Sequence, residues 1–140
     1  MREILFRGQI RKKGEKVRLD GTPIDSNWVY GGVLQGKGDF SIIYQTEPKI
    51  EKFSVYSDTL GQYTGLTDKN GTKIFEGDIV LFNVDERGVV YYDNEETSFM
   101  MEYGNCIVLM GYCYCSRDLE VIGNIHDNPE LLEQEADNGC

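Results

Sequence analysis

Short β-forming runs separated by glycine-rich turns make up most of this chain, and an apolar repeat of helical period is nearly absent. Sixteen glycines lie between runs rich in Val, Ile, Tyr, Phe and Thr. These residue types favour strands, and glycine between them favours turns. The sequence therefore predicts an all-β protein. The expected strands cover residues 3–11, 27–34, 40–46, 52–57, 79–84, 88–93, 97–103, 106–114 and 119–126.

The spacing of these runs predicts two regions and a tail. Residues 1–60 are expected to form an N-terminal antiparallel β region. In 61–133, four or five consecutive strands with short turns predict a small SH3-like barrel or a closely related β-barrel, expected to be one compact unit. One short C-terminal helix should begin where Asn128 caps it and Pro129 takes its first position. Residues 134–140 are expected to be a flexible tail.

The stretch GQYTGLTDKNGTKIFEGDIV, residues 61–80, suggests either a cation loop or a hairpin. A calcium loop that began at Asp68 would need glycine at its sixth position and a bidentate Glu at its twelfth. Here glycine stands at the fourth position and Ile79 at the twelfth. Asn70-Gly71 is instead the pair preferred in a type I′ hairpin turn, because both central residues there need positive φ. We therefore predict a hairpin.

Charge is unevenly distributed along the chain. The net charge is −10, yet residues 1–18 hold seven basic and two acidic residues, which leaves a net −15 on the remainder. The acidic remainder of the chain disfavours general nucleic-acid binding, because most of that affinity comes from basic side chains that neutralise phosphates. The basic arm could instead contact the acidic body of a neighbouring copy, so we expect a homo-oligomer. The expected interaction surface combines basic and aromatic side chains, namely Arg7, Arg11, Lys12, Lys13, Trp28, Tyr30 and Tyr63.

No catalytic, cofactor-binding or metal-binding residue is predicted. The start of the chain does not resemble a signal peptide, so the four cysteines are expected to be reduced. Cys113 and Cys115 form a C-x-C pair that could share a metal, but a structural zinc needs four ligands and the chain has no second C-x-C or C-x-x-C. His126 is the only histidine, so any Ser-His or Cys-His pair must use it.

Several sequence blocks together resemble the YopX family, small proteins of phages and prophages found mostly in Gram-positive bacteria. The resemblance runs nearly end to end and implies an all-β protein, with no established activity, cofactor or catalytic residue to carry over. That family usually has Tyr and Glu at the positions of His126 and Asp127, which argues further against catalysis by His126. The blocks are REILFRGQ, WVYG at 28–31, GQYTGL at 61–66, DKNG at 68–71, IFEGDIV at 74–80 and LEVIGNIHDNPELL at 119–132.

These observations predict a non-enzymatic phage or prophage accessory protein in the cytoplasm of a bacterial host. It should bind a host or phage protein; in one version, its acidic surface mimics nucleic acid. The sequence contains no run of about 18 apolar residues, so no membrane-spanning segment is predicted. One alternative is a nucleic-acid-binding β-barrel that uses the basic N-terminal arm. A further alternative is a metal-dependent hydrolase using acids near Asp78 and Asp118.

Overall fold

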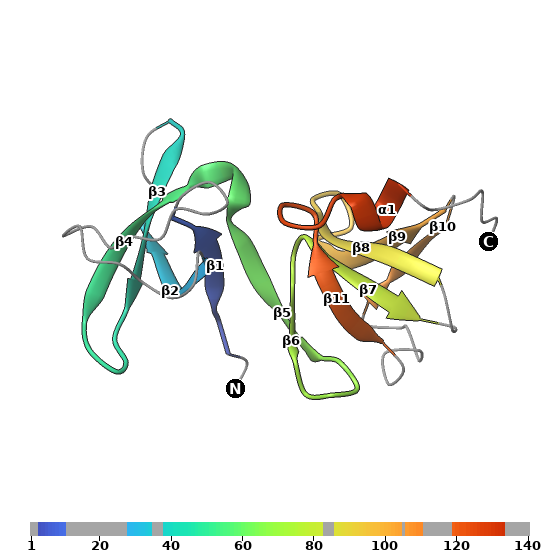
Figure 1. Cartoon of the computed structure of the whole chain (residues 1–140), viewed down its shortest axis with the longest axis horizontal. Helices are drawn as coiled ribbons and strands as arrows, with labels where there is room; N and C mark the ends of the chain where they lie inside the picture. Colours follow the sequence, from blue (N-terminus) through green and yellow to red (C-terminus); the bar gives the residue numbers. More distant parts are fainter. Residues whose placement is uncertain are drawn as a thin grey trace. The chain divides into compact units, whose positions relative to one another are not determined.

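The computed structural model confirms a nearly all-β chain of antiparallel strands (Figure 1). It describes residues 3–10, 28–34, 38–82, 86–104, 106–110 and 119–133. The chain divides into two compact units, Met1–Tyr63 and Thr64–Cys140, which we call unit 1 and unit 2. The strand β5, Gly61–Thr67, runs across this division.

Unit 1 is a twisted antiparallel sheet with strand order β4-β3-β2-β1-β5. Its core lies on one face, where side chains from alternate strand positions meet. Gly8 is part of this face, because a Cβ atom at Gly8 would lie 2.9 Å from Val55 Cγ2. The core residues are Ile10, Val29, Ile43, Phe53 and Val55. The elements are β1 (Phe6–Gln9), β2 (Trp28–Leu34), β3 (Phe40–Gln45), β4 (Glu51–Tyr56) and the 3₁₀ turn η1 (Ser57–Thr59).

Unit 2 contains a five-stranded antiparallel sheet of order β10-β9-β8-β7-β11, preceded by β6 next to β5. Within the described residues this sheet is open, with β10 and β11 as its edges. Closure into the expected SH3-like barrel therefore stays a prediction. The elements are β6 (Lys73–Phe75), β7 (Asp78–Phe82), β8 (Glu86–Asp93), β9 (Ser98–Tyr103), β10 (Cys106–Leu109), β11 (Glu120–Asn124) and α1 (Glu130–Glu133). Its buried core is Ile74, Val80, Phe82, Val90, Met101, Met110 and Leu119.

The turn between β5 and β6 confirms the predicted hairpin but not its type. The Gly71 N–H donates to the Asp68 carbonyl at 3.0 Å, and the Asp68 N–H donates to the Thr72 carbonyl at 2.8 Å. Gly71 has φ +83°, whereas Asn70 is not among the residues with positive φ. The type I′ prediction is therefore wrong. The Asp68 side chain accepts the N–H groups of Asn70 and Thr72, which stabilises a loop ending in one left-handed residue.

The C-terminal helix begins later than predicted and is a single turn. The side-chain oxygen of Asn128, expected to cap this helix, instead accepts the N–H of Asn124 at 3.2 Å. The helix is held on the sheet from β8, where Arg87 Nη1 donates to the Leu131 carbonyl at 2.6 Å. The side chain of Asn128 therefore bonds to β11 and does not cap the helix.

Cys106, a buried residue at the start of β10, is disulfide-bonded in this structure. The expectation of reduced thiols is therefore wrong for Cys106. That expectation rested on the start of the chain, whereas pairing depends on which Cβ atoms the fold brings close together. The other three cysteines lie outside the described residues.

Candidate interaction surface

Aromatic and aliphatic side chains gather on the face of unit 1 opposite its core. Directly paired residues of antiparallel strands point to the same face. The pairs Arg7–Tyr30, Gly32–Tyr44 and Phe40–Tyr56 therefore all lie on this side of the sheet. We call it the outer face, formed by Arg7, Gln9, Trp28, Tyr30, Gly32, Leu34, Phe40, Ile42, Tyr44, Lys52, Ser54 and Tyr56.

Four large side chains of the outer face are solvent-exposed. The exposed fractions are 43% for Tyr30, 51% for Leu34, 47% for Phe40 and 39% for Tyr44. Apolar side chains scattered singly over a surface are common, but a contiguous apolar patch marks an interaction site. Tyr30 and Leu34 come from β2, and Phe40 and Tyr44 come from its neighbour β3, so these four share one patch.

Two consecutive glycines allow Tyr44 to lie close to β2. A Cβ atom at Gly32 would stand 2.5 Å from Cζ of Tyr44, and one at Gly31 would overlap the Tyr44 carbonyl oxygen. The Gly31-Gly32 pair therefore has a packing role that follows from the β2–β3 register. Sequence reasoning placed Trp28 and Tyr30 on one face, but it had no signal for this contact with β3.

Of the predicted interaction residues, the structure brings Arg7, Trp28 and Tyr30 together. The Arg7 guanidinium lies 4.6 Å from the centroid of the Trp28 ring, and Arg7 is only 7% exposed. This is a cation–π contact that also covers the arginine stem. Tyr63 is buried in β5 beside Leu5, whose carbonyl accepts its N–H. Arg11, Lys12 and Lys13 lie outside the described residues.

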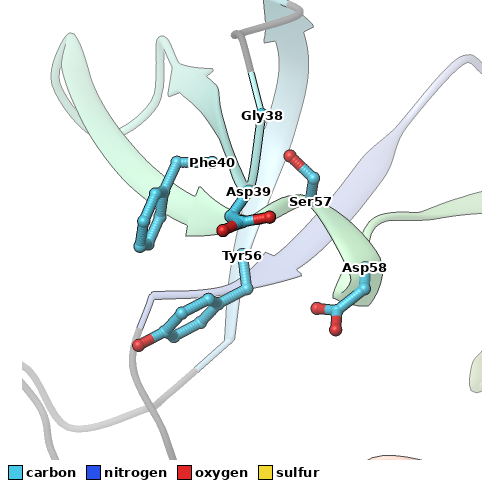
Figure 2. A pocket seen from close by; sticks show the side chains of 6 residues that line it. All are labelled: Gly38, Asp39, Phe40, Tyr56, Ser57 and Asp58. Atoms are coloured by element: carbon cyan, nitrogen blue, oxygen red, sulfur yellow. The ribbon is translucent and has the colours of Figure 1, made fainter.

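A pocket of about 460 Å³ opens where the outer face meets η1 (Figure 2). The Phe40 and Tyr56 rings form one side, with centroids 4.9 Å apart and planes inclined at 37°. Figure 2 shows Asp58 on the other side and the Asp39 carboxylate between it and the rings. The other described lining residues are Gly38 and Ser57, so the described part of the wall holds aromatic and acidic groups but no histidine, cysteine or basic side chain.

Backbone and hydroxyl contacts fix the walls of this pocket. The Ser57 N–H donates to the Asp39 carbonyl at 2.8 Å, and the Ser41 and Ser57 hydroxyls lie 2.8 Å apart. Thr59 Oγ1 donates to the Tyr56 carbonyl at 2.7 Å and accepts the Gln9 N–H at 2.9 Å. The carboxylates of Asp39 and Asp58 are both exposed and take no part in these contacts.

In unit 2, the carboxylate of Asp68 has a structural role. Asp68 is 6% exposed, and its oxygens accept N–H groups from Asn70, Thr72 and Val121 at 2.8–2.9 Å. Burial alone would raise the pKa of Asp68. The backbone donors, helped by the positive charge of Lys69, outweigh burial and hold the pKa below its ordinary value of 3.8. Asp68, at which a calcium loop would have begun, therefore joins the β5–β6 turn to β11.

The other residues of unit 2 considered for metal binding or catalysis do not form a site among the described residues. No group of three or more His, Cys, Asp or Glu within them is placed to hold a metal ion. Asp78 is 1% exposed and accepts the Phe75 N–H at 2.8 Å, so this carboxylate supports the entry to β7. Asp118, its expected partner in a hydrolase, lies outside the described residues. The backbone N–H of His126 donates to Asn124 Oδ1.

Fold and surface define a small two-unit antiparallel β protein that presents an aromatic sheet face. The chain belongs to the YopX family, because the model of that family, described as YopX protein, matches residues 26–133. It is similar in fold to the crystal structure of protein EF1440 from Enterococcus faecalis, with a TM-score of 0.52 and 22% identity, covering 94% of this chain and 99% of that one. No curated protein matches the chain. None of the helices described here is long and apolar enough to cross a membrane.

Proposed function

We propose that this YopX-family protein is a phage or prophage accessory protein without catalytic activity, acting in the bacterial cytoplasm. It binds a host or phage protein through the outer face of unit 1. The observation that carries this proposal is the patch of Tyr30, Leu34, Phe40 and Tyr44, all partly exposed on adjoining strands. Aromatic residues are enriched at protein interfaces, where they supply much of the binding energy.

A protein partner fits this face better than a nucleic acid does. Among the described residues, the outer face carries two basic side chains, Arg7 and Lys52. Arg7 is buried under the Trp28 ring, so its charge is poorly placed to neutralise a phosphate, and only Lys52 is exposed. Asp39 and Asp58 stand at the end of the face, where they would repel a phosphate backbone. Stacking platforms for bases normally combine aromatic residues with a positively charged groove.

The test is partner capture from bacterial host lysate, with and without nuclease, using the tagged protein. We expect a stoichiometric protein partner that survives nuclease and is lost when Tyr30→Ser and Leu34→Ser are combined. The control is Ile50→Ser, since Ile50 is 80% exposed but lies in the β3–β4 connection. Equal capture by the double variant, or capture of nucleic acid alone, would reject the proposal.

Two further proposals concern assembly and the shape of unit 2. We propose that the protein is a homo-oligomer held by its opposite charges, so light scattering should show an oligomer that high salt dissociates; a monomer at low salt would refute this.

We also propose that unit 2 closes as a small SH3-like barrel, since β11 returns to pair with β7, the first strand of the meander. Contacts between β10 and β11 in an experimental structure would establish closure, and their absence would exclude it.

A further inference from the structure

The pocket at the end of the outer face differs chemically from the patch beside it. The patch is aromatic and aliphatic, whereas the pocket adds the carboxylates of Asp39 and Asp58 to the rings of Phe40 and Tyr56. Phe40 is shared by both, since it is 47% exposed on the outer face and also lines the pocket. A partner that covers the patch would therefore also cover the pocket opening.

The pocket offers two kinds of attraction for a positive charge. The face of an aromatic ring attracts a cation within about 6 Å of its centroid, and the attraction grows when water is excluded. Phe40 and Tyr56 supply two adjacent rings, and Asp39 and Asp58 supply two acceptors for charge-assisted hydrogen bonds (Figure 2). Among the described residues that line the pocket, no basic side chain neutralises these carboxylates.

Other ligand classes fit this lining poorly. An anion would meet two carboxylates, and an apolar group would desolvate them without compensation. A calcium ion takes about six to eight oxygen ligands, whereas much of this pocket wall is aromatic. Among cations of protein partners, the planar guanidinium suits the pocket best, because it can stack on a ring while its fork of N–H groups reaches carboxylates.

We propose that this pocket receives an arginine side chain of the protein that binds the outer face. This inference rests on the proposed function and adds the chemistry of the partner: a basic residue next to apolar ones that cover the patch. The net charge of −10 on the chain is consistent with a basic partner, since opposite charges speed association and help fix orientation.

The test measures binding of three fluorescent peptides by anisotropy. One alternates glycine with arginine, the second replaces arginine by lysine, and the third replaces it by citrulline, which is neutral and of nearly equal shape. We expect the arginine peptide to bind most tightly, lysine more weakly and citrulline at least about tenfold more weakly, because its charge-assisted bonds are lost. Equal affinity for the arginine and citrulline peptides would overturn the inference.

Variants locate this binding in the pocket. Asp39→Asn combined with Asp58→Asn should weaken the arginine peptide about tenfold or more, and Phe40→Leu should weaken it several-fold. The matched control is Glu95→Gln with Glu96→Gln, which removes two exposed charges from the β8–β9 turn in unit 2 and should leave affinity within about twofold. Amide NMR spectra establish that each variant remains folded.

The outcomes separate this inference from the proposed function. If the control variant weakens the peptide as much as the pocket variant does, binding reflects net charge alone and the pocket inference fails. The proposed function then still stands if the Tyr30→Ser, Leu34→Ser double variant loses its captured partner. If that partner is retained while the pocket variant loses the arginine peptide, the arginine site is real but the proposed partner surface is wrong.

Discussion

Replacing Asp68 by asparagine should destabilise unit 2 and change how its stability depends on pH. The side chain accepts three backbone N–H groups, and one of them, from Val121, lies 53 residues away in sequence. A hydrogen bond to a charged group contributes about 1.5–3 kcal/mol, and such bonds are not additive. Asparagine keeps one acceptor oxygen, so we expect a loss of about 2–4 kcal/mol near neutral pH.

The pH dependence has a definite sign. The pKa of Asp68 is depressed in the folded protein below the ordinary value of 3.8. Its carboxylate therefore contributes stability that is fully present above the pKa of the unfolded state and is lost as pH falls through the folded pKa. The difference in unfolding free energy between the wild-type protein and Asp68→Asn should be largest above about pH 5 and shrink below pH 4.

Urea denaturation followed through the amide NMR signals of unit 2 measures this difference. Asp93→Asn is the matched control, because Asp93 accepts the N–H groups of Glu95 and Glu96 in an exposed turn. We expect this control to cost less than about 1 kcal/mol, since water can replace its bonds. A cost for Asp68→Asn no greater than for the control, or a difference that grows as pH falls, would show that the Asp68 carboxylate does not stabilise unit 2.

Two other substitutions test the packing of each unit. Gly31→Ala should destabilise unit 1 by about 1–3 kcal/mol, because its methyl group would overlap the Tyr44 carbonyl oxygen; an unchanged urea midpoint in tryptophan fluorescence would contradict this close approach. Arg87→Met should cost unit 2 about 1–2 kcal/mol through the lost bond to the Leu131 carbonyl and should speed amide exchange in residues 130–132; unaltered exchange there would show that Arg87 does not hold the helix.

The strands were predictable because local patterns determine them. Alternation of apolar and polar residues and the glycines between runs predict β2, β3, β4 and most strands of unit 2. The β5–β6 hairpin was also predictable, but its turn type was not. Asp68 competes with the Asn70-Gly71 preference by accepting two local N–H groups, and its third bond depends on distant β11.

The surface was only partly predictable. Sequence reasoning selected Trp28 and Tyr30, yet it could not show that Arg7 is buried or that Phe40 and Tyr44 extend the patch. Exposure and neighbours on a sheet follow from strand order and register, and β1 pairs with β5 across more than 50 residues of sequence. The pocket likewise depends on η1, a 3₁₀ turn that no local pattern indicated.

The most direct test of the central claim is photo-cross-linking from the outer face inside the bacterial host. Tyr30 is replaced by p-benzoylphenylalanine in one variant, and Tyr92 in the other. The two tyrosines are matched in exposure at 43% and 38%, but Tyr92 lies in unit 2. We expect one dominant protein adduct from position 30 and none from position 92. Adducts from position 92 alone, or only nucleic-acid adducts from position 30, would contradict it.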